Sequence, residues 1–433
     1  MHGRTPAAAA VIALLFGSVL VPSPAAPTLL TIPQQDRIRS TAGNGAVSVS
    51  ADGRYLALTS YARLAAGDTD DYADIYVLDL STNSVTLESA PGDGLQLAGD
   101  CDHPSVSADG RYVAFESAVV DSANGAPVTD VLLRDRVTGT TRRISAGPRG
   151  VKANGWSSSP AISASGKAVA FTSAATNLVA NHDVNGSQPD IYLFELDTGT
   201  MRRVSVDSTG TQQPGGSVTP SITADGRTVA FSSAAALTSD STGSAENPAV
   251  FVRHVSAGRT VRVAPAIGRP NGASAMPAIS ADGNTLAFVS RATNLAPGDR
   301  NRSSDVFLYD VATRAVTLVS RTRTGGAANG ASSNPAISGD GRFVLFQSEA
   351  SDLACPPCPP DVEDINLVSD VFVFDRTTGQ VACVSAGTDG SWMEESGAPA
   401  VDASGQVVAF TSRHPISPRD TGHDFDLFVR VDR

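Results

Sequence analysis

Residues 277–290 read PAISADGNTLAFVS, and six other stretches of the chain repeat this text with small changes. The further copies are VSVSADGRYLALTS (47–60), PSVSADGRYVAFES (104–117), PAISASGKAVAFTS (160–173), PSITADGRTVAFSS (220–233), PAISGDGRFVLFQS (335–348) and PAVDASGQVVAFTS (399–412). The glycine of the central turn recurs at positions 53, 110, 166, 226, 283, 341 and 405, at intervals of 56 to 64 residues. This spacing indicates an array of seven similar supersecondary units.

Each copy has the composition of two β-strands joined by a tight turn. A short apolar segment such as PAIS meets a turn pair that ends in glycine, here Asp-Gly, where glycine accepts a positive φ, and a second apolar run follows. In that second run both faces are apolar, as Leu286 and Phe288 on one side and Ala287 and Val289 on the other illustrate. A strand with two apolar faces is expected to lie between two other sheets.

A second phrase follows each copy at a looser distance and contributes two more β-prone runs, as in ADIYVLDLSTNSVTLES (73–89). Each unit therefore contains four strands, named A to D here in chain order. Seven four-stranded units around one axis predict an all-β fold, a seven-bladed β-propeller. Known propeller repeats of about 40–50 residues are shorter, so we expect the excess in the B–C and D–A loops.

The two ends of the chain predict how the ring closes. The seventh unit stops after strand C, at DFDLFVRVDR (424–433), whereas Arg37-Ile38-Arg39-Ser40 precedes the first strand A. This tetrapeptide resembles the strand D text of Arg142–Ser145 and Arg202–Ser205. We expect the N-terminal segment to supply the fourth strand of blade seven, which would also cover an exposed sheet edge.

The repeated text resembles the WD40-like PD40 repeat of TolB-type propellers. The resemblance rests on the pattern P-[AS]-[IV]-S-x-D-G-R-x-[VL]-A-F-x-S and on the later D-[IV]-[YF]-[VL]-x-D-x-x-T-G, and it covers essentially all of 27–433. It implies a secreted bacterial protein built of such repeats. TolB carries an additional α/β domain and prolyl oligopeptidase-type enzymes carry a hydrolase domain, whereas this chain leaves no room for either and contains no G-x-S-x-G. A fold of this kind hosts unrelated functions, so the resemblance fixes none.

Composition narrows the class of protein further. Residues 1–26 contain an early arginine, an apolar core from Ala7 to Val21 and small residues after a proline, which is typical of a secretory signal peptide. We therefore expect an extracytoplasmic protein in which 27–433 form one propeller domain and no later segment spans a membrane. A net charge of −12, with only two lysines, argues against a nucleic-acid partner.

Four cysteines are present: Cys101, Cys355, Cys358 and Cys383. In an exported protein an even number favours disulfides, and four cysteines allow three pairings. Cys355 and Cys358 form a C-x-x-C in the B–C loop of unit six. Redox chemistry would require a thioredoxin-like context, and zinc would require further thiolates or histidines nearby, so a structural disulfide is the favoured interpretation.

The B–C loops carry an acidic pattern that is typical of a hard cation such as calcium. The candidate ligands are Asp68, Asp70 and Asp74 in unit one, Asp183, Asn185 and Asp190 in unit three, and Asp299, Asn301 and Asp305 in unit five. Alternating side-chain oxygens followed by a later carboxylate suit Ca²⁺, although the full EF-hand pattern is absent. The alternative is turn chemistry, in which Asp and Asn side chains bond nearby backbone N–H groups and begin strand C. In unit four Ala249 replaces the leading Asp.

Aromatic and histidine side chains give the remaining candidates. Trp156 and Trp392 lie in D–A loops, the latter followed by Glu394 and Glu395, and an exposed tryptophan there could bind a sugar or a peptide or could equally cover apolar edges. The histidines of 27–433 are dispersed over five units, at positions 103, 182, 254, 414 and 423, without metal-binding spacing.

These observations leave three functional hypotheses. The first is a non-catalytic binding scaffold for a protein, a peptide or a cell-envelope glycan, using the face that carries the B–C and D–A loops. The second is a secreted glycan lyase or hydrolase, which requires a histidine and a carboxylate, or two carboxylates, to converge near the channel mouth. The third is a structural exoprotein stabilised by calcium.

Overall fold

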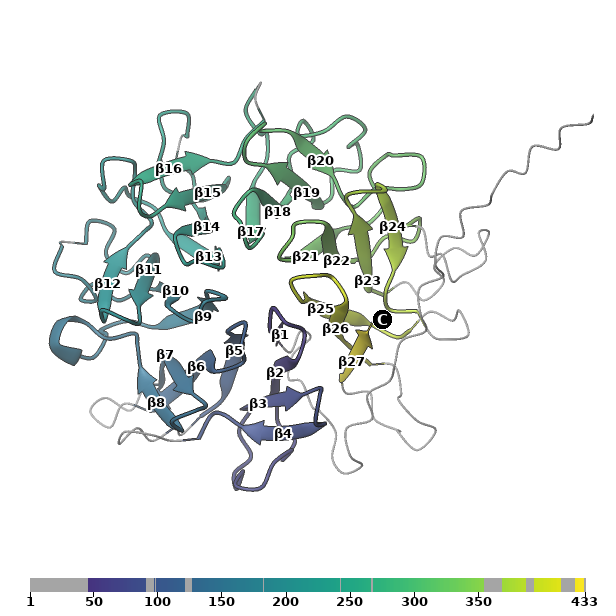
Figure 1. Cartoon of the computed structure of the whole chain (residues 1–433). Helices are drawn as coiled ribbons and strands as arrows, with labels where there is room; N and C mark the ends of the chain where they lie inside the picture. The colour runs from purple at the N-terminus through teal and green to yellow at the C-terminus, as the bar shows by residue number, and fades with distance from the viewer. Residues whose placement is uncertain are drawn as a thin grey trace, which may run out of the picture.

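The computed structural model describes residues 46–90, 97, 99–120, 127–181, 183–241, 243–265, 268–353, 368–386, 393–413 and 425–431. These residues form seven antiparallel sheets arranged in a ring (Figure 1). The predicted all-β, seven-bladed propeller is therefore confirmed. The one helical element of the described part is the 3-10 turn η1 (Pro148–Gly150), so none of these residues forms a helix able to cross a bilayer.

The strands follow the predicted order A to D in each blade. Blade 1 contains β1 (Val47–Val49), β2 (Tyr55–Ser60), β3 (Asp74–Asp79) and β4 (Ser84–Leu87), and blade 2 contains β5 (Cys101–Val106), β6 (Tyr112–Val120), β7 (Pro127–Asp135) and β8 (Thr140–Arg143). Blade 3 contains β9 (Ser157–Ile162), β10 (Ala168–Ser173), β11 (Asp190–Glu195) and β12 (Thr200–Arg203), and blade 4 contains β13 (Ser217–Ile222), β14 (Thr228–Ser233), β15 (Ala249–His254) and β16 (Arg259–Arg262). Blade 5 contains β17 (Ser274–Ile279), β18 (Thr285–Ser290), β19 (Asp305–Asp310) and β20 (Val316–Leu318), and blade 6 contains β21 (Ser332–Ile337), β22 (Phe343–Ser348), β23 (Asp370–Asp375) and β24 (Gln380–Cys383). Blade 7 contains β25 (Ser396–Val401), β26 (Val407–Ser412) and β27 (Asp426–Val431).

Ring closure is visible at the innermost strands. Each strand A contacts the strand A of both neighbouring blades, and β25 of blade 7 contacts β1 of blade 1 (Figure 1). An apolar cluster that includes Leu56, Tyr76, Val407 and Leu427 lies between these two blades. The described part of blade 7 has three strands, and the predicted fourth, at 37–40, lies outside the described residues and stays a prediction.

The core lies between adjacent blades, as the two apolar faces of strand B predict. Aromatic rings on strands B and C pack against each other in five blades, with centroids 5.4 Å apart for Phe410 and Phe428 and 6.1 Å apart for Phe231 and Phe251. Both rings of each of these two pairs are almost completely buried. Burial on both sides of the same strand explains why the A-F-x-S text is repeated so faithfully.

The Asp-Gly turns between strands A and B require glycine for two reasons. Gly110 has a φ of +67°, which L side chains rarely adopt. A Cβ at this position would also lie 2.1 Å from the ring of Tyr55 in the preceding blade. Ser107 accepts the Gly110 N–H with its carbonyl and donates its hydroxyl to Asp109 at 2.7 Å. The turn thus combines a local conformation with a contact between blades.

Candidate functional site

The central channel contains a cavity of about 470 Å³, lined by the same two positions of every blade. In six blades these positions hold a residue followed by proline, and in blade 1 they hold Ala46 and Val47. The six dipeptides are His103–Pro104, Ser159–Pro160, Thr219–Pro220, Met276–Pro277, Asn334–Pro335 and Ala398–Pro399. Among the side chains that line this cavity, only that of His103 is ionisable.

A bulge in strand A brings these residues to the channel. The register of β5 against β6 shifts between Asp102 and Ser105, and the inner strands of blades 3 to 7 shift at the equivalent place. The residue before each proline has a φ between 48° and 54°, although none of the six is glycine. A left-handed conformation costs about 1–2 kcal/mol for such residues. Strain of this kind gathers at functional sites, and here it is repeated around the channel.

Polar side chains from strand B satisfy the backbone of the bulges. Glu116 accepts the N–H of Ser159 at 2.9 Å, and the Ser232 hydroxyl accepts the N–H of Met276 at 3.1 Å. Both acceptors occupy the variable position x of A-F-x-S, one blade before the N–H that they bind. The x position therefore faces the channel and connects neighbouring blades.

Blade 2 places a charged cluster at this otherwise neutral channel. His103 Nδ1 lies 3.1 Å from Glu116 Oε1 and 3.6 Å from Asp102 Oδ2, and the hydroxyl of Thr59 donates to Asp102 Oδ1 at 2.9 Å. The hydrogen bond to Glu116 raises the pKa of His103 above its usual value against the opposing effect of burial. Asp102 is the second residue of a strand that starts on the loop-rich side, and it pairs with Glu116. The cluster thus lies in the half of the channel nearer that face.

Sequence reasoning missed this cluster because its members come from two strands and are adjacent only through the bulge. In the sequence His103 is one of five dispersed histidines of 27–433, and its spacing does not point to Glu116. A signal was nevertheless present, because unit two alone has a histidine before its proline and a carboxylate at position x. Unit two thus departs from the repeat at two positions that share a face, and this coincidence points to the pair of His103 and Glu116.

The leading Asp of strand C has a structural role in five blades. The serine two residues after strand D donates its hydroxyl to this carboxylate in each of them, at 2.7 Å between Ser205 and Asp190 and at 2.6 Å between Ser385 and Asp370. The same hydroxyl accepts the N–H of the residue after the aspartate, as for Ile191 at 3.1 Å. In blade 4 both partners are alanine, Ala249 and Ala264. Turn and strand chemistry thus accounts for part of the acidic pattern.

In blade 1 the predicted ligands converge. Asp68, Asp70 and Asp74 place carboxylate oxygens within 4.8 Å of one another, and the hydroxyl of Tyr76 donates to Asp68 at 2.6 Å. Burial, together with the charges of Asp68 and Asp70, raises the pKa of Asp74 to about 6. An acidic cluster suited to a metal ion therefore exists at this loop.

In blade 3 an arginine lies among the predicted ligands. Arg203 Nη2 lies 3.3 Å from Asp183 Oδ2, and its Nε lies 3.3 Å from Asp190 Oδ2. Gln212 donates to the same two carboxylates at 3.0 and 2.7 Å. Asn185 donates its amide to the carbonyl of Gly215 at 3.3 Å.

In blade 5 the equivalent residues are Asp299, Asn301 and Asp305. Asn301 donates its amide to Asp305 Oδ2 at 2.9 Å and to the carbonyl of Ala328 at 2.7 Å, and it accepts the N–H of Ser303. Burial raises the pKa of Asp299, and burial also raises the pKa of Asp305 to about 6.

The structure places the remaining candidates as follows. Trp156 directly precedes the inner strand β9 and is 41% exposed, so it is available for contact. Glu395 lies 3.4 Å from Arg413, and the carbonyl of Glu394 accepts hydrogen bonds from Ser396 and Ser412. Trp392 lies outside the described residues, as do the histidines at 182, 414 and 423.

The cysteines that the structure describes are buried within blades. Cys101 is a free thiol, 3.5 Å from the Ser117 hydroxyl, and burial raises its pKa to about 12. Cys383 is 2% exposed on β24, on a different blade. Within the described residues no disulfide joins these two cysteines. Cys355 and Cys358 lie outside the described residues, so a disulfide that involves either of them stays a prediction.

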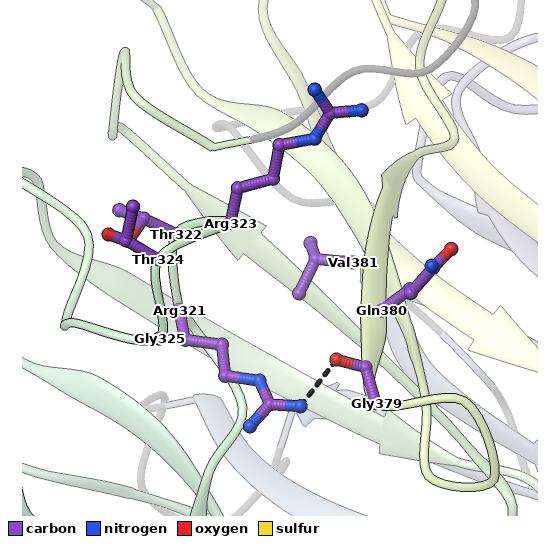
Figure 2. A pocket seen from close by; sticks show the side chains of 8 residues that line it. All are labelled: Arg321, Thr322, Arg323, Thr324, Gly325, Gly379, Gln380 and Val381. Carbon is purple, nitrogen blue, oxygen red and sulfur yellow. Dashed lines mark hydrogen bonds between the residues drawn. The ribbon is translucent and has the colours of Figure 1, made fainter.

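A second cavity, of about 330 Å³, lies between blades 5 and 6. Figure 2 shows Arg321 and Arg323 on the hairpin that follows β20, with Arg321 donating to the carbonyl of Gly379. The guanidinium of Arg321 also lies 5.1 Å from the ring centroid of Phe374. Such contacts join the start of a D–A loop to the next blade, which indicates a structural role for this region.

Comparisons with known proteins found solved structures of similar fold. No protein-family model and no curated protein sequence matches the chain. An oligogalacturonate lyase from Vibrio parahaemolyticus is similar in structure, with a TM-score of 0.54 and 12% identity, over 92% of this chain and 92% of that chain. The β-propeller domain of the Trilobed protease from Pyrococcus furiosus, described as having an open velcro topology, gives 0.53 and 12% over 90% and 94%. The putative TolB from Agrobacterium tumefaciens gives 0.39 and 20% over 63% and 79%.

The chain is thus a seven-bladed β-propeller, and its structural neighbours include TolB and related propellers. This architecture is consistent with the resemblance of the repeats to TolB-type PD40 propellers. At these identities the likeness concerns the fold, and neighbours of different activity share it.

Proposed function

We propose that the protein is an exported, non-catalytic binding scaffold that binds a protein, a peptide or a cell-envelope glycan on its B–C/D–A loop face. One observation carries this proposal. Among the described residues, the exposed large apolar side chains are Tyr72, Val137, Val151, Trp156, Val184, Val218 and Met276. Four of the seven belong to B–C or D–A loops, whereas Val218 and Met276 lie on inner strands and Val137 lies at a C–D turn.

Single exposed apolar residues are common on protein surfaces. Only their concentration on one part of the surface points to a binding site. Aromatic residues dominate the binding energy of many interfaces, so Tyr72 and Trp156 are the strongest anchors on this face. The blades beneath them are rigid, and the loops can vary without disturbing the core. The acidic B–C loop of blade 1 would favour a ligand that carries cationic groups.

The test is retention of envelope fractions on the immobilised protein, which is expected to start after the predicted signal peptide at 1–26. Wild-type protein should retain a protein, peptide or glycan component. Tyr72→Ala and Trp156→Ala should each reduce retention, whereas the matched control Val137→Ala, at a C–D turn, should not. Equal retention by all three variants, or none by the wild type, would overturn the proposal.

A second candidate function is catalysis in the channel by a glycan lyase or hydrolase. The pair His103–Glu116 favours it, because a histidine hydrogen-bonded to a carboxylate can transfer protons. The test is incubation with acidic polysaccharides, with formation of unsaturated or shortened products as the readout. Activity that is lost in Glu116→Gln and retained in Thr172→Ser would support it; the control alters the equivalent position of blade 3.

We also propose calcium binding by Asp68, Asp70 and Asp74, which would stabilise the B–C loop of blade 1 in an extracellular setting. The convergence of their carboxylates supports this proposal. Asp70→Asn should lower calcium affinity without altering the fold, since Asp70 is exposed. An unchanged calcium affinity would mean that these aspartates serve only to bond nearby backbone N–H groups in the turn.

A further inference from the structure

The internal repeats allow the acidic B–C loops of blades 3 and 5 to be compared at matched positions in one chain. Asp183 and Asp190 of blade 3 correspond to Asp299 and Asp305 of blade 5. A residue of strand D lies next to these carboxylates. It pairs with the residue of strand C that is two positions after the leading Asp. In blade 3 this residue is Arg203, opposite Tyr192, and in blade 5 it is Leu318, opposite Phe307.

The strand D side chain beside the carboxylates is therefore basic in blade 3 and apolar in blade 5. In blade 3 the guanidinium of Arg203 bridges both carboxylates, and the side chains of all three residues are at most 6% exposed. Blade 2 follows the same scheme, since Arg143 Nε lies 2.9 Å from Asp130 Oδ2. A buried carboxylate is strongly destabilising unless a cation or donors compensate it, and here an internal arginine provides that cation.

Blade 5 keeps the carboxylates and lacks the cation. Asp299 is only 6% exposed, and its Oδ1 accepts no hydrogen bond from the described residues. Asp305 is fully buried, and its carboxylate accepts hydrogen bonds from the Ser320 hydroxyl and the Asn301 amide, both of which are uncharged. Within the described part of the chain no basic side chain forms an ion pair with either carboxylate. Leu318 lies in the apolar core instead.

We propose that blade 5 binds a divalent hard cation, Ca²⁺, between Asp299 and Asp305, at the place that an arginine occupies in blade 3. Calcium takes about six to eight oxygen ligands, so backbone carbonyls and water complete the shell around the two carboxylates. Asn301 acts as a positioning residue, because its amide fixes Asp305 and its carbonyl accepts the Ser303 N–H. The identity of the strand D residue thus decides whether a blade holds an internal or an external cation.

This inference is independent of the loop-face binding function, and reciprocal variants test it. The measurement is the number of calcium ions bound per chain, by isothermal titration calorimetry with CaCl₂ alone, with MgCl₂ as the comparison. Asp299→Asn and Leu318→Arg should each bind one calcium ion fewer than the wild type. Arg203→Leu should bind one more, and calcium should raise its melting temperature more than that of the wild type.

Further variants keep the test decisive. Leu318→Met keeps an apolar side chain and should retain the wild-type stoichiometry, so it controls for disturbance of the core by Leu318→Arg. Asp299→Asn tests the site even where Leu318→Arg fails to fold. Unchanged calcium stoichiometry in Asp299→Asn would overturn the proposal, as would a wild-type protein that binds no calcium. A magnesium response equal to that of calcium would overturn the assignment to Ca²⁺.

Discussion

The hydroxyl of Ser205 donates a 2.7 Å hydrogen bond to the buried carboxylate of Asp190, and it also accepts the N–H of Ile191 at 3.1 Å. One hydroxyl thereby fixes the start of strand C to the end of strand D, and four other blades repeat the arrangement. It explains why D-[IV] and V-S recur together in the sequence.

We predict that Ser205→Ala lowers the free energy of unfolding by about 1–3 kcal/mol, because it leaves a buried N–H without its acceptor and a carboxylate without one donor. Urea unfolding measures this change. Ser187→Ala, at an exposed loop position, should remain within about 0.5 kcal/mol of the wild type. Equal effects of the two substitutions would contradict the structural role of the Ser205–Asp190 pair.

Titration of His103 tests the channel cluster. Its pKa is expected above the ordinary histidine value because Glu116 accepts a hydrogen bond from the ring. A histidine pKa that is raised on folding stabilises the protein at pH values below the unfolded pKa of about 6.5, and this contribution is lost as the pH rises through the folded pKa. NMR titration of the His103 ring should show a lower pKa in Glu116→Gln. An unchanged value would mean that the hydrogen bond does not form in solution.

The channel residues with a left-handed backbone conformation should keep or gain stability when they are replaced by glycine. Ala398 has a φ of 48°, so Ala398→Gly should leave stability unchanged or raise it by up to about 1 kcal/mol as strain is relieved. Ala398→Val should lower stability by more than about 1 kcal/mol, because β-branched residues rarely adopt this conformation. Chemical denaturation of both variants measures the difference. A valine variant as stable as the glycine variant would contradict strain at the bulge.

The predicted closing strand can be tested by truncation. If 37–40 complete the sheet of β25 to β27, a protein that begins at residue 41 should have a lower melting temperature than one that begins at residue 27. Hydrogen exchange at the amides of β27 should also be faster in the shorter protein. Identical melting temperatures and exchange rates would mean that blade 7 does not use this segment.

The repeats alone predicted the strand order, the blade number and the burial of strand B, because runs that are apolar on both faces and Asp-Gly turns are local signals. The His103–Glu116 pair was not predictable in the same way, since it depends on a bulge before Pro104 that shifts the register. Arg203 was likewise read as strand text. Its role as a partner of Asp183 and Asp190 depends on packing between segments that the sequence separates by a variable loop.

Ligand binding to the loop-rich face should be measurable by hydrogen exchange with and without the retained envelope component. Bound ligand should slow exchange in the described B–C and D–A loops, at 61–73 and 147–156, with no change at the C–D turn of 136–139. Protection confined to the C–D turns, or no protection anywhere at saturating ligand, would contradict it.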